Sequence, residues 1–153
     1  MVELIINPIL GTRKRALMPL ENQEEIIMII SYDKAFLATY RVLDKMYHVH
    51  PSESLLVIVG DMDPFIWIGL KSADPAAYHD FVKCCKQVEA QGGQEDEINT
   101  AFQCALAYLQ FFNDEFAFPL MEEKERFSME DFKAAWQWAE ETGLPLLQQR
   151  CPE

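Results

Sequence analysis

The sequence lacks a long apolar run, a glycine-rich phosphate loop and a catalytic signature motif. No stretch approaches the roughly 20 consecutive apolar residues that a membrane-spanning helix needs. The G-x-S-x-G and H-E-x-x-H patterns are also missing, so hydrolase and nucleotide-binding templates have no support. The first ten residues are too short for a secretion signal and include Glu3. We therefore expect a soluble protein of a reducing compartment, the cytoplasm, without membrane partners.

Cysteines are few, and their spacing fits neither a disulfide framework nor a zinc module. The four are Cys84, Cys85, Cys104 and Cys151, with no C-x-x-C pair among them. Adjacent cysteines rarely bond to each other, and a reducing compartment keeps thiols free. We expect buried structural thiols and no bound metal or other cofactor.

Basic residues are also scarce, with 13 Lys and Arg against 25 Asp and Glu and a formal net charge of −12. The whole acidic surplus lies after His50. A field of this sign repels nucleic acid and anionic membranes and attracts basic proteins. The single basic cluster, Arg13-Lys14-Arg15, is too small for a nucleic-acid footprint and is interpreted as a solvated loop.

What the chain has in abundance is core material. Its 153 residues are 50% hydrophobic and include ten Phe, five Tyr and three Trp. A chain of this size buries enough surface to fold as one domain without metal or disulfide. The pattern predicts a mostly α fold, a single-domain helical bundle over residues 1–153, with its oligomeric state left open.

Two helices are predicted in the first two thirds of the chain. Asp74-Pro75 is a helix start, because Asp accepts hydrogen bonds from unpaired amides and Pro at the first position loses none. Apolar residues at three- and four-residue spacing carry this helix to about Ala90. An earlier helix is expected to open at Ser31 or Asp33 and to run to about His48.

Two more helices are predicted towards the C-terminus. One is expected to be capped by Asn99 or Thr100, and its apolar stripe continues to Phe112. The other follows a capping box at residues 128–131, and the sequence predicts that Gly143 with Pro145 ends it.

Three apolar segments are ambiguous between helix and strand. Val2–Leu10 and Ile26–Ile30 leave room for a short N-terminal strand pair. Ser52–Gly60 holds a β-rich run behind a helix-like Ser cap, and its helical neighbours favour a helix.

The central stretch, Gly60-Asp61-Met62, then Gly69, then Ala73-Asp74-Pro75-Ala76-Ala77-Tyr78-His79-Asp80-Phe81, is similar to a pattern in small acidic bacterial proteins. The similarity centres on residues 31–85. This part of the chain resembles the immunity proteins of contact-dependent growth inhibition systems. The resemblance implies a non-enzymatic inhibitor that binds and neutralises a basic cognate toxin, such as a nuclease.

Candidate partner-binding residues follow from exposure and charge. Trp67 stands in an apolar loop, and aromatic side chains exposed on loops are frequent binding hot spots. The alternative is that Phe65 and Trp67 are buried in the core, as most large aromatics are. The acidic candidates are Asp61, Asp63, Glu95, Asp96, Glu97, Glu122, Glu123 and Glu125.

Two other functions stay open on the sequence alone. His48, His50, Asp61 and Asp63 are residue types that bind a divalent metal or act as acid and base, which permits a metal-dependent hydrolase. Their spacing is uninformative, since Asp63-Pro64 also starts turns. The third alternative is a non-catalytic adaptor that recognises an apolar segment with little salt dependence.

Overall fold

The computed structural model describes residues 30–93 and 96–151. Within them the chain is helical, with no strand, which confirms the predicted mostly α fold. The ambiguous N-terminal segments, with the expected strand pair and the Arg13-Lys14-Arg15 cluster, lie outside the described residues, apart from buried Ile30. The elements are α1 (Tyr32–Val49), α2 (Glu53–Met62), α3 (Pro75–Ala90), α4 (Glu97–Phe116), α5 (Met121–Arg126), α6 (Met129–Trp138), a π-helical turn η1 (Ala139–Gly143) and α7 (Leu144–Arg150).

Side-chain caps fix most of the helix starts where the sequence placed them. Ser31 accepts from Lys34 N at 3.2 Å, and Asp74 accepts from Ala76 N at 3.0 Å. Such caps satisfy amides that have no partner within the helix. Ser52 and Ser128 cap α2 and α6 in the same way, so the ambiguous Ser52–Gly60 segment is helical.

The predicted cap of α4 was wrong. The helix begins at Glu97, and its N-cap is Asp96 rather than Asn99 or Thr100. The Asp96 carboxylate accepts from Asn99 N at 2.8 Å and from Asn99 Nδ2 at 2.9 Å. Asn99 is therefore the donor in this cap rather than the capping residue.

The predicted end at Gly143 and Pro145 was also wrong, because the chain stays helical through η1 into α7. Gly143 has φ −66° and ψ −47°, so it is no left-handed cap. A Cβ at Gly143 would lie 2.9 Å from the Trp138 ring, so the glycine makes room for that ring. The π turn pairs Leu144 N with Ala139 O, and Pro145 falls in the first turn of α7, where a missing amide costs least.

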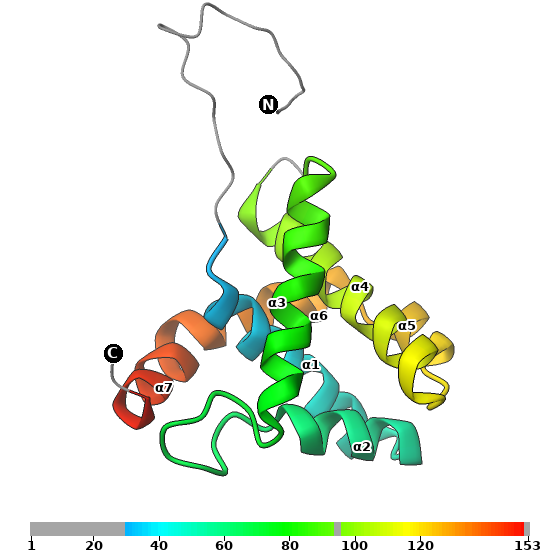
Figure 1. Ribbon diagram of the computed structural model, residues 1–153, viewed down its shortest axis with the longest axis horizontal. Helices are drawn as coiled ribbons and strands as arrows, with labels where there is room; N and C mark the ends of the chain where they lie inside the picture. Colours follow the sequence, from blue (N-terminus) through cyan, green and yellow to red (C-terminus); the bar gives the residue numbers. More distant parts are fainter. Residues whose placement is uncertain (1–29, 94–95, 152–153) are drawn as a thin grey trace, which may run out of the picture.

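An aromatic cluster in the core joins α1, α3 and α4. Phe36 packs edge-on against Phe81 at 5.3 Å, and Phe81 packs edge-on against Tyr108 at 5.7 Å between ring centroids. All three side chains are buried. In Figure 1, α3 stands in front of α1, with α7 to one side and α4 and α5 to the other. Across the described residues, no helix is long and apolar enough to span a membrane.

Candidate partner-binding site

The segment between α2 and α3, residues 63–73, is a compact loop that we call the tryptophan loop. A hydrogen bond between the residues that flank the loop holds its two ends together: Asp74 N donates to Asp61 O at 3.0 Å. At its start, the Asp63 carboxylate accepts from Phe65 N at 2.9 Å, the turn that Asp63-Pro64 predicts. At its end, buried Ser72 donates to Asp74 O at 2.6 Å. Loops closed in this way hold one shape on the surface.

The C-terminal helix supports the middle of the loop. Arg150 O accepts from Gly69 N at 2.8 Å, while Arg150 Nη2 donates to Phe65 O at 2.6 Å. Cys151 Sγ adds a contact of 3.3 Å to Leu70 O. Gly69 has φ +91°, a conformation that glycine adopts without strain. Figure 1 shows the loop lying against the end of α7.

A third attachment ties the loop to α1. Lys71 Nζ lies 3.1 Å from both carboxylate oxygens of Asp33, and the Tyr78 hydroxyl donates to the same carboxylate. Lys71 also sits over the Tyr78 ring, 5.1 Å from its centroid. Burial, then the Asp33 carboxylate, raises the pKa of Tyr78, so the phenol keeps its proton. These contacts span α1, the loop and α3.

Despite these anchors, the apolar side chains of the loop face solvent. Ile66 is 50%, Trp67 55% and Ile68 79% exposed, and Leu70 is exposed as well. Phe65 behaves differently, because it is half-buried and packs edge-on against Tyr40 at 6.4 Å. The alternative of two buried aromatics is therefore wrong for Trp67, which lies on the surface, while Phe65 packs only partly buried against the core. Exposed apolar groups held by rigid backbone are typical of binding surfaces.

Two of the predicted carboxylates border the tryptophan loop. Asp61 and Asp63 are both half-buried at the end of α2. Burial raises the pKa of Asp61, and the nearby Asp74 carboxylate raises it further. Negative charge is thus crowded at the base of the tryptophan loop, where its two ends meet.

The predicted acids near the start of α4 have structural partners. Glu97 Oε2 accepts from Ser31 N at 2.9 Å, which joins α4 to the start of α1. Hydrogen bonds from Asn99 lower the pKa of Asp96, the α4 cap. Glu95 lies outside the described residues. This turn lies at the opposite end of α3 from the tryptophan loop, about 24 Å away along its 16 residues.

The acids of α5 divide between surface and interior. Glu122 and Glu125 are exposed, while Glu123 is buried, with its carboxylate 3.7 Å from Arg126. In Figure 1, α5 and the tryptophan loop lie on opposite sides of the view. The predicted acids in the described part of the chain therefore occupy three separate places, of which one is the start of the tryptophan loop.

The His and Asp residues of the hydrolase alternative are not brought together. His48 and His50 lie at the end of α1, before α2 begins, and Asp61 and Asp63 lie at its far end. The 10 residues of α2 separate the two pairs by about 15 Å. His48 Nδ1 lies 2.7 Å from Asp44 O, as for a ring that caps a helix carbonyl. Within residues 30–93 and 96–151, no group of three or more His, Cys, Asp or Glu side chains is placed to hold a metal ion.

The cysteines are free thiols, and Cys84, Cys85 and Cys104 are buried as the sequence predicted, whereas the prediction was wrong for Cys151, which is half-buried next to the tryptophan loop. Burial raises the pKa of Cys84 to about 11. A hydrogen bond with Cys104, and then burial, raises the pKa of Cys85. Protonated, buried thiols are poor nucleophiles, so this group serves packing.

Sequence reasoning missed the residues that hold the site together. Arg150 and Phe65 are 85 positions apart, and Lys71 and Asp33 are 38 apart. No local pattern joins residues at such distances. Gly69 was the one available signal, since a glycine amid apolar loop residues indicates an unusual backbone conformation. No protein-family model, curated protein or solved structure matches the chain.

Proposed function

We propose that this protein is a non-catalytic inhibitor that binds a basic protein partner through the tryptophan loop. The observation that carries the proposal is the 55% exposure of Trp67 on a loop fixed by hydrogen bonds to α7. Binding normally costs the entropy of ordering a surface loop. Because this loop is already ordered, that cost is small, and the indole is available as an anchor.

Charge supports the choice of a basic partner. The chain carries a formal net charge of −12, and Asp61 and Asp63 border the exposed apolar residues. A cationic partner would be attracted from a distance and would then cover the apolar side chains. The raised pKa of Asp61 adds a local reason, since a nearby cation stabilises a crowded carboxylate.

The resemblance of residues 31–85 to immunity proteins of contact-dependent growth inhibition systems narrows the proposed partner to a toxin. On this reading the partner is a cognate toxin that acts in the cytoplasm, where the inhibitor meets it. A nuclease toxin fits the charge best, because enzymes that bind phosphate backbones carry cationic active sites. The acidic surface would cover such a site, and no cofactor is needed for this action.

The test is capture from native lysate on the immobilised protein, with elution along a salt gradient. Wild type, Trp67→Ala and Leu56→Ala are compared. Leu56 is 53% exposed on α2, so its variant removes an apolar side chain of similar fractional exposure outside the loop. We expect one basic protein to elute late from wild type and Leu56→Ala. Loss of a hot-spot tryptophan costs roughly 2 kcal/mol or more, about 30-fold in affinity, so Trp67→Ala should release it early.

Inhibition is tested separately by expressing the captured protein with and without this chain. Wild type and Leu56→Ala should restore growth, and Trp67→Ala should not. Equal retention by all three proteins would remove the tryptophan loop from the interface. A captured protein that harms no cells would overturn the immunity reading and leave a binder of another kind.

A further inference from the structure

A groove between α1 and α6 departs from the acidic character of the rest of the molecule. It has a volume of about 420 Å³, within the range of small-molecule sites. Three cationic side chains and one histidine line it, against a single acid, Asp131. We call it the basic groove; besides Asp131, its lining residues are Arg41, Val42, Lys45, Met46, Val49, His50, Arg126, Ala134, Ala135 and Trp138.

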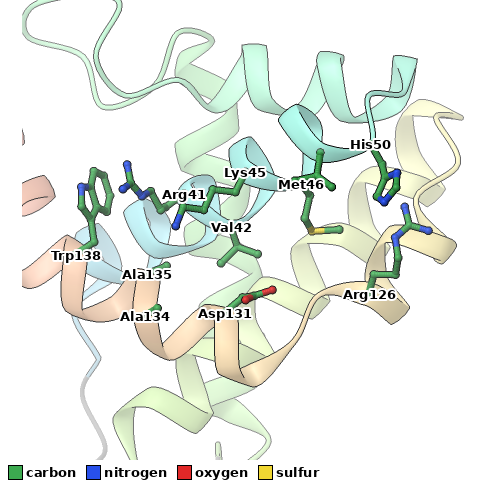
Figure 2. A pocket seen from close by; sticks show the side chains of 11 residues that line it. Arg41, Val42, Lys45, Met46, His50, Arg126, Asp131, Ala134, Ala135 and Trp138 are labelled. Carbon is green, nitrogen blue, oxygen red and sulfur yellow. The ribbon is translucent and has the colours of Figure 1, made fainter.

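The groove is open because α6 contributes small side chains where α1 contributes larger ones. Ala134 and Ala135 of α6 face α1, whereas Val42 and Met46 of α1 form the opposite wall. Trp138 closes one end, with the Arg41 guanidinium 4.5 Å from its ring centroid. Figure 2 shows His50 and Arg126 at the other end, with the apolar residues between the two ends. The groove therefore has an apolar floor and cationic ends.

The cations at the Trp138 end form no ion pair with an acid in the described part of the chain. Among the described residues, neither Arg41 nor Lys45 forms an ion pair, although the chain has many more acids than bases. The two residues are four apart on α1 and so lie on one face of the helix, with their Cβ atoms about 6 Å apart. Arg126, by contrast, is paired with Glu123. Within residues 30–93 and 96–151, the unpaired positive charge of the groove therefore lies beside the Trp138 indole.

We propose that the basic groove binds an amphipathic organic carboxylate. Its carboxylate would lie between Arg41 and Lys45, and its apolar body would extend over Val42, Met46 and Ala135. An anion is the complementary charge for this pair, and a carboxylate accepts hydrogen bonds from both side chains at once. The acidic surface elsewhere repels the same ligand, so binding is confined to the groove. This site is independent of the tryptophan loop and of the partner proposed for it.

The probe is dodecanoate, titrated below its micelle-forming concentration and followed by calorimetry. Dodecyltrimethylammonium, with the same chain and the opposite charge, is the ligand control. Lys45→Glu tests the cationic end, and Lys86→Glu reverses an exposed charge on α3 as the matched control. Ala134→Trp fills the groove at an exposed position, where the larger side chain need not disturb the core.

Wild type and Lys86→Glu should bind dodecanoate at one site with equal affinity. Loss of a charge-assisted hydrogen bond should weaken binding to Lys45→Glu about tenfold or more. Ala134→Trp should not bind, while its circular dichroism and melting temperature match wild type. Absence of saturable binding to wild type would overturn the proposal. So would equal affinity for the two ligands, or an affinity unchanged in Lys45→Glu.

Discussion

Two regions of this molecule are equally rich in apolar side chains, yet one is the core and the other is surface. Phe36, Phe81 and Tyr108 are buried in mutual contact. Ile66 and Trp67 are half exposed, although their neighbours in sequence are just as apolar. Composition alone does not separate the two regions.

The difference lies in periodicity. In a helix, apolar residues three or four apart share one face, so a whole stripe is buried at once. In the tryptophan loop the apolar residues are consecutive, and their side chains point in different directions. Phe65 reaches the core margin and packs on Tyr40, while Trp67 and Ile68 point to solvent.

The two regions are also held by different forces. Burial of aromatic area stabilises the core and has no strong direction. The loop is fixed by directional hydrogen bonds to Arg150, Cys151 and Asp33. Apolar substitutions should therefore destabilise the core, whereas the loop should be sensitive to the loss of its hydrogen-bonding partners.

The largest effect is expected for Phe81→Ala. Removal of a fully buried ring from between Phe36 and Tyr108 leaves a cavity, which should lower the free energy of unfolding by about 3–5 kcal/mol. Urea denaturation measures this change. Phe116→Ala, at a ring that is 48% exposed, is the control and should lose less than half as much. Equal losses would mean that the core does not depend on this aromatic contact.

The next largest loss of stability is expected for Arg150→Met. This variant keeps the apolar stem of the side chain and removes the donor to Phe65 O. Hydrogen bonds to charged groups contribute roughly 1.5–3 kcal/mol. Arg150 Nε is buried without a hydrogen-bond partner among the described residues, which is unfavourable. Removing it therefore offsets part of the stability lost with the hydrogen bond to Phe65 O. We expect unfolding to be easier by about 1–2 kcal/mol, with faster amide exchange in the loop.

Lys86→Met, at an exposed position of α3, controls for the loss of one cation. It should leave exchange in the loop unchanged. If Arg150→Met also leaves that exchange unchanged, the C-terminal helix does not hold the loop.

Ile68→Ser should change stability by less than about 0.5 kcal/mol, because the side chain is 79% exposed. Thermal unfolding measures the change. This result would contrast directly with Phe81→Ala, although both variants remove an apolar side chain. A loss near that of Phe81→Ala would show that Ile68 is buried in solution.

Asp61→Asn should have the smallest effect, and the effect should depend on pH. Burial and Asp74 raise the pKa of Asp61 in the folded protein, so its charge opposes folding at neutral pH. As pH falls through this raised pKa towards the ordinary pKa of an aspartate, the free energy of unfolding of the wild type should rise. Asp61→Asn should therefore be the more stable protein at pH 7, and the difference should shrink on acidification.

Denaturant midpoints across this pH range measure the difference. Glu125→Gln, which removes an exposed carboxylate from α5, controls for net charge. A difference between Asp61→Asn and wild type that stays constant with pH would contradict the assignment.

The sequence predictions are accurate where the deciding interactions join residues close in sequence, and inaccurate where they do not. The cap at Asp74 and the end near Ala90 were predicted correctly, because a helix terminus is set by residues within a few positions. The start of α4 was misplaced, since Asp96, Asn99 and Thr100 are all cap formers and local chemistry does not rank them. Gly143 was misread because its role is to admit the Trp138 ring.

The candidate site was predicted in part. Trp67, Asp61 and Asp63 were named from their residue types, and they do border one loop. The other predicted acids within the described residues are distant from it, because a charge pattern carries no information on which helix ends meet. The support from Arg150 and Lys71, and the basic groove between α1 and α6, were not predicted at all.

The sequence by itself determined the helical class, the capped starts of α1, α2, α3 and α6, and the acidic charge, but not the short helices α5 and α7. These depend on periodicity, capping and composition, which act over a few residues or over the whole chain. The tertiary structure alone decided that Trp67 faces solvent while Phe65 does not, and that Arg41 and Lys45 border an apolar groove. Exposure and grooves depend on which distant segments pack together, and that is set by the whole core at once.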